Sequence, residues 1–349
     1  MALLHMLIKR EIGCLSRPLI CCGGWCHKQY YKHREDSMET VAVINYKGGV
    51  GKTTVTANLA AELAWRGKNV LVLDTDAQAS LTFSFVTPDY WDAELEKTRT
   101  IKSWFDAISE GKAPPSLSDF VYTPPQVNGR VGRNGGSLDI ICSHLGLLNV
   151  DLELATLLGG ANLAQSKRNY LKVHGQLRRA MNQLADESDY DIVLLDCPPN
   201  FNIVTKNAIV ASEKILIPAK PDYLSTLGID YLHRSVNGLV KEFNEYSQLE
   251  NDEESISPEI MGVVFTMIQY MNEQPIAAQR QFMATVKREG IPVFENFFRE
   301  NKSIFADAPQ QLIPVVLNQY NSQTHSQVVS EIENFVDEFE STLEVAEDE

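Results

Sequence analysis

The sequence predicts an α/β fold in which a mainly parallel sheet of about seven strands is covered by helices on both faces. Three observations predict it. Short apolar runs rich in Val and Ile recur along the chain, and stretches with helical periodicity separate most of them. These runs are apolar at consecutive positions, as strands buried on both faces usually are. The first run leads through a Gly-rich turn and a helical stretch to the second, which is a βαβ unit.

The expected elements follow one another from residue 38 onwards. Seven strands are expected at the apolar runs, of which the last is the least regular: Val41–Ile44, Val70–Leu73, Leu138–Cys142, Ile192–Leu195, Ile215–Ile217, Met261–Thr266 and Val293–Phe297. A helix is expected from Thr53 to Arg66, with Gly67 ending it. A second clear helix is expected over residues 324–341, where Val328, Ile332, Phe335 and Phe339 recur at helical spacing.

Two stretches interrupt the alternation. Residues 82–137 contain several prolines and a Gly-rich segment at 128–136, with a short helical piece at Ile101–Ile108. We interpret this stretch as an excursion from the sheet and not as a second domain. Residues 248–259 are acidic and polar and are expected to form a surface loop.

Composition and charge exclude several classes of protein. The chain has 349 residues, 44% of them hydrophobic, and a formal charge of −15. This composition is ordinary for a globular protein, and no run of about 18 apolar residues predicts a membrane-spanning helix. The surplus of acids argues against a surface adapted throughout to polyanions, although a local basic patch is compatible with it. The last 24 residues hold nine acids and no base, which excludes a basic amphipathic membrane anchor there.

The first 37 residues differ from the rest in charge and in cysteine content. They hold six Lys or Arg against three acids and four of the six cysteines, and they form neither a disulfide framework nor a signal peptide. We therefore expect a cytoplasmic protein with a dispensable extension, or a start assigned too early, because Met38 stands just before the first strand. The alternative is a zinc site at Cys21, Cys22, Cys26 and His27, whose spacing fits no standard pattern.

The segment Lys47-Gly48-Gly49-Val50-Gly51-Lys52-Thr53-Thr54 stands where the first strand ends and the first helix begins. Glycines allow backbone N–H groups to face one anion there, and the helix N-terminus adds its positive end. Lys52 can reach the outer phosphates of a nucleotide, and the Thr53 hydroxyl can bind Mg²⁺. Residues 47–54 are therefore predicted to be a P-loop that binds ATP.

An ordinary P-loop has Gly at position 46, but this chain has Tyr46 followed by an additional lysine, Lys47. On these residues the sequence resembles the ParA/MinD family of deviant Walker A ATPases, and it is most similar to the ParA-like partition ATPases. The resemblance implies a P-loop NTPase fold. It also implies that Lys47 is a signature lysine, which crosses a dimer interface to contact the partner's nucleotide much as an arginine finger does.

Two further segments support the resemblance. Residues 71–78 look like the family's second motif, which implies that Asp76 orients the attacking water and that Asp74 supports Mg²⁺ or the loop lysines. The family usually has Pro where this chain has Ala77. Residues 190–199 resemble the Walker B strand and its Pro-Pro switch, so Asp196 is expected to hold Mg²⁺. The resemblance covers roughly residues 39–318, and it delimits an ATPase domain at 38–323 and an acidic helix and tail at 324–349.

The resemblance implies an Mg²⁺-dependent ATPase that forms a homodimer on ATP and acts as a molecular switch in partitioning or positioning. ParA-like members bind nonspecific DNA as ATP dimers, and a ParB-like partner stimulates hydrolysis and so releases them. DNA binding needs a basic surface. A single helix over residues 166–184 would put Arg168, Lys172 and Arg179 on one face, although a solvated outer face explains these cations equally well. Weaker candidates for DNA contact are Lys206, Lys214 and Lys220.

Two alternative functions share this kind of P-loop. Dethiobiotin synthetase and cobyrinic acid amidases use ATP to activate a carboxylate, but some lack the signature lysine and some append a glutamine-hydrolysing domain. Neither feature fits a chain of this length that carries Lys47. A MinD-like ATPase binds membrane through a C-terminal amphipathic helix, whereas the helix expected at 324–341 has an acidic polar face, so we expect it to dock on the protein's own core.

Overall fold

The computed structural model describes residues 38–249, 254–272, 274–319 and 322–345. These residues belong to one contact-defined unit, Asp36–Glu349. The N-terminal extension with its four cysteines, the middle of the acidic loop at 250–253 and the end of the acidic tail lie outside the described residues. The zinc alternative and the dispensability of the extension therefore stay predictions.

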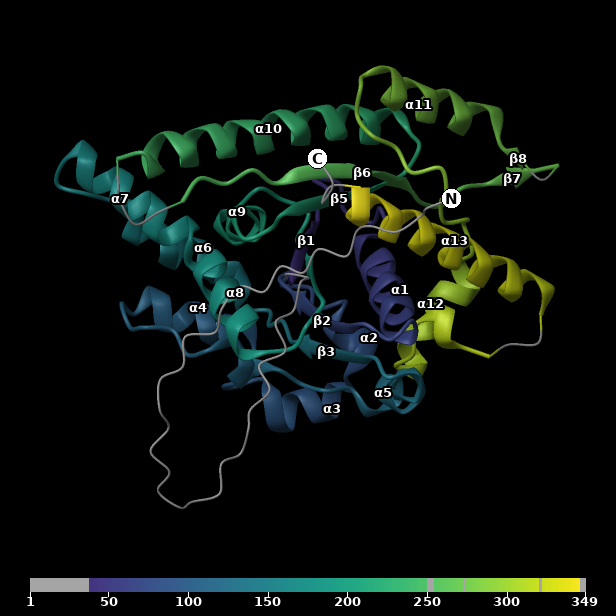
Figure 1. Ribbon diagram of the computed structural model, residues 1–349, viewed down its shortest axis with the longest axis horizontal. Helices are drawn as coiled ribbons and strands as arrows, with labels where there is room; N and C mark the ends of the chain where they lie inside the picture. Colours follow the sequence, from purple (N-terminus) through teal and green to yellow (C-terminus); the bar gives the residue numbers. More distant parts are fainter. Residues whose placement is uncertain (1–37, 250–253, 273, 320–321, 346–349) are drawn as a thin grey trace, which may run out of the picture. The chain divides into compact units, whose positions relative to one another are not determined.

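A parallel sheet of six strands, in the order β3-β2-β4-β1-β5-β6, forms the centre of the described residues (Figure 1). Its strands are β1 Glu39–Val43, β2 Asn69–Asp74, β3 Ser137–Ile141, β4 Ile192–Asp196, β5 Lys214–Ala219 and β6 Glu259–Phe265. Two very short strands, β7 Tyr270–Met271 and β8 Gln274–Pro275, pair separately as an antiparallel hairpin. The mainly parallel α/β architecture is confirmed.

The predicted seventh strand at 293–297 is wrong. Val293 forms only an isolated bridge to Val263 in β6. The backbone N–H groups of Glu295 and Asn296 donate instead to the carboxylate of Glu338, at 2.7 and 2.9 Å. Because a side chain takes these donors, they are not available to a neighbouring strand, and the segment does not continue the sheet.

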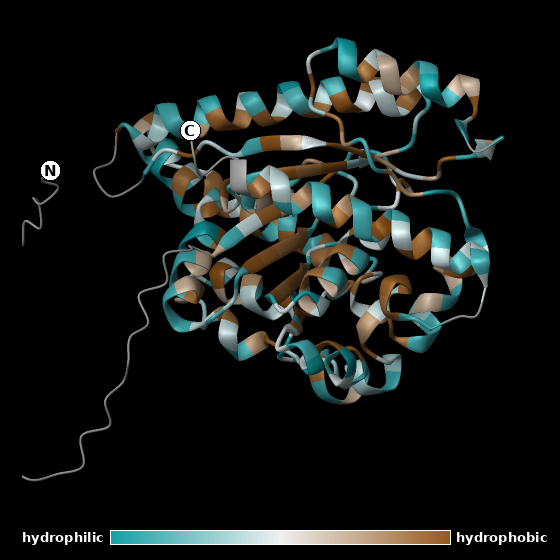
Figure 2. Cartoon of the chain, turned by 45° about the vertical axis from the view of Figure 1, so that its right-hand side comes forward, coloured by the Kyte–Doolittle hydropathy of each residue, from teal (hydrophilic) through white to brown (hydrophobic). Residues whose placement is uncertain are grey.

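Helices cover both faces of the sheet, and the strand residues alternate between the two faces. Val41 and Val43 of β1 point into one core, and Ala42 and Ile44 point into the other. The first core is covered by α1 Lys52–Trp65, α2 Thr82–Phe85, α5 Pro125–Val131, α12 Lys302–Gln311 and α13 Gln323–Val345. The second is covered by α4 Ile101–Ser109, α6 Leu147–Ala155, α7 Leu163–His174, α8 Gln176–Glu187, α9 Ile203–Val210, α10 Tyr223–Ser247 and α11 Ala277–Arg288. Figure 2 shows the apolar strands between these amphipathic helices.

The C-terminal helix α13 packs on the core. Phe335 and Phe339 are fully buried in it, together with Val328 and Ile332. The acids of α13 meet a cation at the end of α1, because Arg66 donates to the carboxylates of Asp337 at 2.6 Å and Glu340 at 2.8 Å. The helix α13 thus contributes an apolar face to the core, and Arg66 at the end of α1 neutralises part of the negative charge of α13.

The irregular stretch 82–137 is built from short helices that contribute to both cores. α4 buries Trp104 and Phe105 against one face of the sheet, and α5 buries Val127 and Val131 against the other. Shorter elements lie between these helices along the chain: α3 Pro88–Tyr90 comes before α4, and the 3₁₀ turn Leu117–Phe120 lies between α4 and α5. The stretch therefore packs as part of the same unit.

The single helix predicted over residues 166–184 is wrong, because the chain forms two helices that meet at Gly175. α7 ends at His174 and α8 begins at Gln176. Glycine is a poor helix former, and here it ends one helix and starts the next. A face calculated at 100° per residue across this break has no physical meaning, so Arg179 does not share a helix with Arg168 and Lys172.

Candidate functional site

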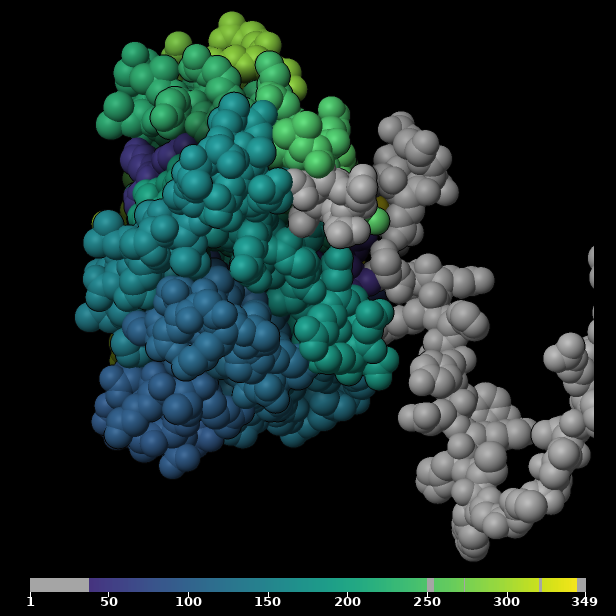
Figure 3. All heavy atoms as spheres, turned by 90° about the vertical axis from the view of Figure 1, so that its left-hand side faces the viewer, coloured from purple at the N-terminus to yellow at the C-terminus, as the bar shows by residue number. Residues whose placement is uncertain are grey.

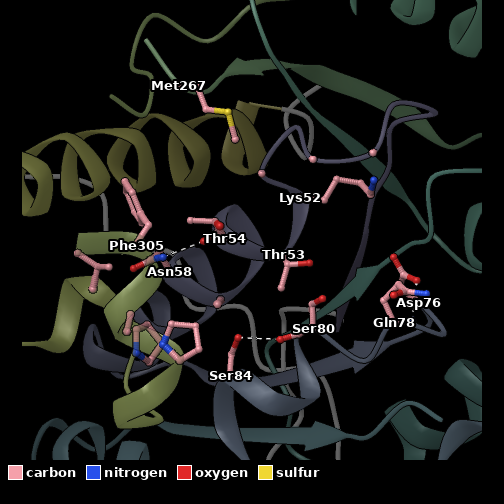
Figure 4. A pocket seen from close by; sticks show the side chains of 18 of the residues that line it. Lys52, Thr53, Thr54, Asn58, Asp76, Gln78, Ser80, Ser84, Met267 and Phe305 are labelled. Carbon is pink, nitrogen blue, oxygen red and sulfur yellow. Dashed lines mark hydrogen bonds between the residues drawn. The ribbon is translucent and has the colours of Figure 1, made fainter. Parts of the chain in front are cut away.

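A cavity of about 470 Å³ opens at the carboxyl ends of the central strands. The Gly-rich loop after β1, the loop after β2 and the helix α12 line it (Figure 4). Lys52 and Asp76 lie toward one end of this cavity, and Asn58 and Phe305 lie toward the other. Ligands of open α/β sheets bind at this edge of the strands.

The Gly-rich loop turns through backbone conformations that suit glycine. Gly49 and Gly51 have φ of +67° and +87°, in the left-handed region. Gly51 also lies against Thr266, whose Cγ2 would be 3.4 Å from a Cβ at position 51. Gly51 is the N-cap of α1, and no side chain caps this helix within the described residues. The first N–H groups of α1 therefore face the cavity without a side-chain acceptor, which is the arrangement that binds phosphate.

Lys52 is buried at the start of α1, with 7% of its surface exposed. Its ammonium donates to the carbonyl oxygens of Asn45, at 3.2 Å, and Lys47, at 3.5 Å. Burial lowers the pKa of Lys52, while the carboxylates of Asp196 and Asp76 counteract this effect. The predicted P-loop lysine thus lies beneath the loop with long hydrogen bonds that a phosphate oxygen could replace.

Thr53 and Asp196 meet at the base of the cavity. The Thr53 hydroxyl donates to Oδ2 of Asp196 at 2.7 Å. The other oxygen of this carboxylate, Oδ1, is buried and has no hydrogen-bond partner among the described residues. Burial raises the pKa of Asp196 to about 7. A hydroxyl beside a buried carboxylate with a free oxygen fits the oxygen ligands that Mg²⁺ prefers.

Asp74 lies opposite Asp196 in the β2–β4 register and is fully buried. Its two oxygens already have partners in the chain. Oδ1 accepts from the N–H of Asp76 at 3.1 Å, and Oδ2 accepts from the N–H and the hydroxyl of Thr82, both at 2.8 Å. Burial, and then the charge of Asp196, raise the pKa of Asp74 to about 8. The side chain therefore holds the loop that carries Asp76.

Asp76 is half-buried between two cavities. It lines the main cavity and also a neighbouring one of about 210 Å³, which lies against α6 and the Pro198-Pro199 loop. Its Oδ1 accepts from the N–H of Gln78 at 3.0 Å. A carboxylate at this place can accept a hydrogen bond from a water molecule beside the phosphates.

Lys47 points away from the main cavity, toward α10. Its ammonium contacts both carboxylate oxygens of Asp222, at 2.8 and 2.7 Å, and the Ser225 hydroxyl at 3.2 Å. The sequence analysis did not identify Asp222. An Asp that follows strand β5 and stands three residues before Ser225 carries the signal of a helix N-cap, but this signal does not indicate which cation it binds.

The sequence analysis also missed the wall of a second cavity, of about 120 Å³, which adjoins the first at Gly51 and Thr54. Met267, after β6, and Phe305, in α12, line both cavities. Phe298 and residues 299–302 contribute a further part of the wall. These residues lie more than 200 positions after the P-loop, so only the folded chain brings them together.

Of the three cations in the main DNA-contact prediction, Lys172 and Arg179 lie side by side although they belong to different helices. Arg168 and Lys172 are exposed on α7, and Arg179 is exposed on α8, where its guanidinium donates to the Lys172 carbonyl at 2.6 Å. Figure 3 shows the side of the molecule on which α7 lies, in the segments coloured teal. Lys214 pairs with Glu259 at 2.6 Å at the far end of β5. Lys206 and Lys220 are half-buried, and the Lys206 ammonium lies 5.9 Å from the centre of the Phe201 ring.

The described residues contain neither a ready-made cluster of metal ligands nor a membrane-spanning helix. No group of three or more His, Cys, Asp or Glu side chains is placed to hold a metal ion, so any Mg²⁺ at Asp196 would need further oxygens from Thr53, phosphate or water. Within the same residues, no helix is long and apolar enough to cross a membrane. Cys142 and Cys197 are buried free thiols, and burial raises their pKa far above the ordinary value.

Residues 38–249 match the AAA_31 family of AAA domains. The chromosome partitioning protein ParA of Caulobacter vibrioides is 28% identical over 67% of this chain and 72% of its own length. The sporulation initiation inhibitor protein Soj of Bacillus subtilis is 28% identical over 65% of this chain and 72% of its own length. The chain spans only about half the length of some other curated relatives it matches.

Solved structures show the same fold. The ATP complex of a single-residue variant of McdA from Cyanothece superposes with a TM-score of 0.61 at 19% identity, covering 86% of this chain and 95% of that one. Cobyrinic acid a,c-diamide synthase from Mycobacterium smegmatis, with bound ADP and magnesium, superposes with a TM-score of 0.52 at 22% identity, covering 78% of this chain and 91% of that one. Both likenesses concern the fold alone.

Proposed function

Because the chain belongs to the AAA_31 family of AAA domains and is ParA-like in sequence, we propose that it is an Mg²⁺-dependent ATPase that dimerises on ATP and acts as a switch in DNA partitioning or in positioning another cellular assembly. One observation carries the proposal. The uncapped N-terminus of α1 lies next to the Thr53–Asp196 pair, whose carboxylate has an unused buried oxygen. The first feature suits a triphosphate, and the second suits its cation.

The nucleotide would lie across both cavities. Its phosphates would accept from the N–H groups of Gly48 to Thr54, and Lys52 would exchange its long bonds to carbonyl oxygens for a phosphate oxygen. The base would occupy the 120 Å³ cavity between Met267 and Phe305, where apolar walls suit a flat ring.

Thr53 and Asp196 would hold Mg²⁺, which when bound supplies charge that neutralises the phosphates. Asp74 would support this site indirectly, since both of its oxygens hold the chain near Asp76 and Thr82. Asp76 would accept a hydrogen bond from the attacking water and align it with the γ-phosphate. Lys47 would reach the nucleotide of a second copy, as the family resemblance implies.

Asp76→Ala tests the catalytic part of the proposal. The variant should still bind ATP and form ATP-dependent dimers, because Asp76 belongs to neither the P-loop nor the metal pair. Phosphate release should fall by about 10²- to 10⁴-fold, the usual contribution of a general base. Light scattering measures the dimer, and a phosphate assay measures turnover. A variant that remains monomeric in ATP, or one with normal turnover, would contradict the role given to Asp76.

We further propose that the ATP-bound dimer binds nonspecific DNA, in the cytoplasm or on the nucleoid, and that a ParB-like protein stimulates ATP hydrolysis. Co-sedimentation with DNA across a salt series tests this, since binding to phosphates must weaken steeply as salt rises. Replacing Arg168 and Lys172 by Ala should weaken ATP-dependent binding, while Lys68→Ala is the matched control, because Lys68 is an exposed lysine that lies on neither α7 nor α8. Absence of ATP-dependent binding would favour a protein scaffold.

A further inference from the structure

The ammonium of Lys47 is fully paired within its own subunit. It lies 2.8 and 2.7 Å from the two oxygens of Asp222 and 3.2 Å from the hydroxyl of Ser225. An ammonium has three N–H donors, and these three acceptors match them in number. Lys47 therefore has a complete set of partners before any nucleotide or second subunit arrives.

Asp222 is anchored and charged where it meets Lys47. It is the N-cap of α10, and its Oδ1 accepts from the N–H of Ser225 at 2.8 Å. Burial alone would raise the pKa of Asp222, but the hydrogen bonds from Lys47 and Ser225 hold it below its usual value. The carboxylate is thus ionised at neutral pH and fixed to the helix end.

The residues before Lys47 hold the loop against the same region. The N–H of Lys47 donates to Oδ1 of Asn45 at 2.9 Å, and the amide of Asn45 donates to the carbonyl of Pro218, at the end of β5, at 2.8 Å. The ring of Tyr46 packs on that of Tyr231 in α10, with centroids 5.0 Å apart. Backbone and ring contacts therefore orient Lys47 toward α10.

We propose that Asp222, assisted by Ser225, is a positioning residue that holds Lys47 on its own subunit until a second copy brings its nucleotide. The inference rests on the proposed function, since it assumes that Lys47 reaches a partner's phosphates. A phosphate oxygen can replace a carboxylate oxygen as the acceptor of the Lys47 ammonium. Lys47 therefore keeps charge-assisted hydrogen bonds when it leaves Asp222 for the nucleotide of the second copy. The pair is partly exposed to solvent, so its loss should shift dimerisation by a few-fold and not by orders of magnitude.

The first test needs neither nucleotide nor dimer. The rate at which an amine-acylating reagent modifies Lys47 is measured by mass spectrometry in the full chain and in Asp222→Asn. Asn also caps helices well, so α10 should persist. We expect acylation several-fold faster in the variant, because the ammonium loses its carboxylate. Asp230→Asn is the matched control, because Asp230 lies on the same helix and pairs with Arg234 instead. An unchanged rate in Asp222→Asn would overturn the proposal.

The second test measures the ATP concentration that gives half-maximal dimerisation. Asp222→Asn should lower it by about three- to fivefold, as the loss of a partly exposed ion pair predicts. Asp222→Ser, which also caps helices, should act alike. In a Lys47→Ala background, Asp222→Asn should change nothing. A higher concentration in Asp222→Asn would mean that Asp222 serves the dimer and would overturn the proposal. If the unmodified chain does not dimerise at any ATP concentration, the proposed function fails, while the acylation result still decides whether Asp222 holds Lys47.

Discussion

The carboxyl edge of the central strands and the outer helices α6 and α7 differ in which side chains they bury and which they expose. At the strand edge, ionisable side chains are buried: Lys52 is 7% exposed, and Asp74 and Asp196 are at most 1% exposed. On α6 and α7, large apolar side chains are exposed, since Leu152 and Leu163 are each 73% exposed. Each arrangement departs from the rule that apolar groups lie inside and charges outside.

These two kinds of departure have different effects on the stability of the fold. Buried ionisable groups without full partners destabilise a fold, and Oδ1 of Asp196 and the long bonds of Lys52 leave room for a ligand that supplies the missing partners. Exposed leucines neither help nor harm the fold much, so Leu152 and Leu163 carry little of the stability of the outer helices.

Lys52→Ala should abolish the ligand function of the strand edge and leave the fold intact. Charged hydrogen bonds contribute about 1.5–3 kcal/mol each, so loss of the contacts to phosphate should weaken nucleotide binding by about 10²-fold or more. Titration with a fluorescent nucleotide and a phosphate-release assay measure the effect, and circular dichroism checks the fold. Lys68→Ala, at an exposed lysine just after α1, is the control. Unchanged ATPase activity in Lys52→Ala would remove the P-loop assignment.

Two leucines of α6, one buried and one exposed, allow the contribution of each kind of position to stability to be compared. Leu154 is 1% exposed in the core, so Leu154→Ala should lower the free energy of unfolding by about 2–5 kcal/mol. Leu152→Ala, two residues earlier and 73% exposed, should change it by less than about 0.5 kcal/mol. Urea unfolding measures both. A large loss in Leu152→Ala would show that the exposed surface belongs to the fold after all.

His174, at the end of α7, should make stability depend on pH. Burial, with a smaller effect of Lys206, lowers its pKa to about 3. The unfolded chain takes up a proton near pH 6.5, but the folded chain does not, so this stability is complete above that pH and is lost as the pH falls toward 3. The loss reaches at most about 1.4 kcal/mol per pH unit.

His174→Phe removes the titrating group, so in urea unfolding between pH 7 and pH 5 the variant should lack the loss of stability that His174 causes as the pH falls. The raised pKa values of Asp74 and Asp196 act in the opposite direction, since the stability that these groups contribute is lost as the pH rises toward about 8 for Asp74 and about 7 for Asp196. The difference between the two proteins therefore isolates His174. Equal pH slopes in both would show that His174 gains a proton in the folded state.

The sequence was most informative where function and local geometry coincide. The P-loop, Asp76 and Asp196 each follow a strand of the βαβ pattern, and the parallel sheet brings them to one edge, as expected. Local signals were less reliable where a tertiary contact competes. The strand predicted at 293–297 fails where Glu338 of α13 takes the N–H groups of Glu295 and Asn296. The helix predicted over 166–184 fails for a local reason instead, because it breaks at Gly175.

The sequence was enough to predict the mainly parallel α/β class and to place the Gly-rich loop between the first strand and the first helix, because periodicity and glycine placement are local properties of the chain. The tertiary structure alone decided that Asp222 binds Lys47, that Met267 and Phe305 close a second cavity, and that Asp74 holds the chain at Thr82. Those partners stand far from each other in the sequence or on separate elements. Their meeting depends on how helices pack on the sheet, which no local pattern encodes.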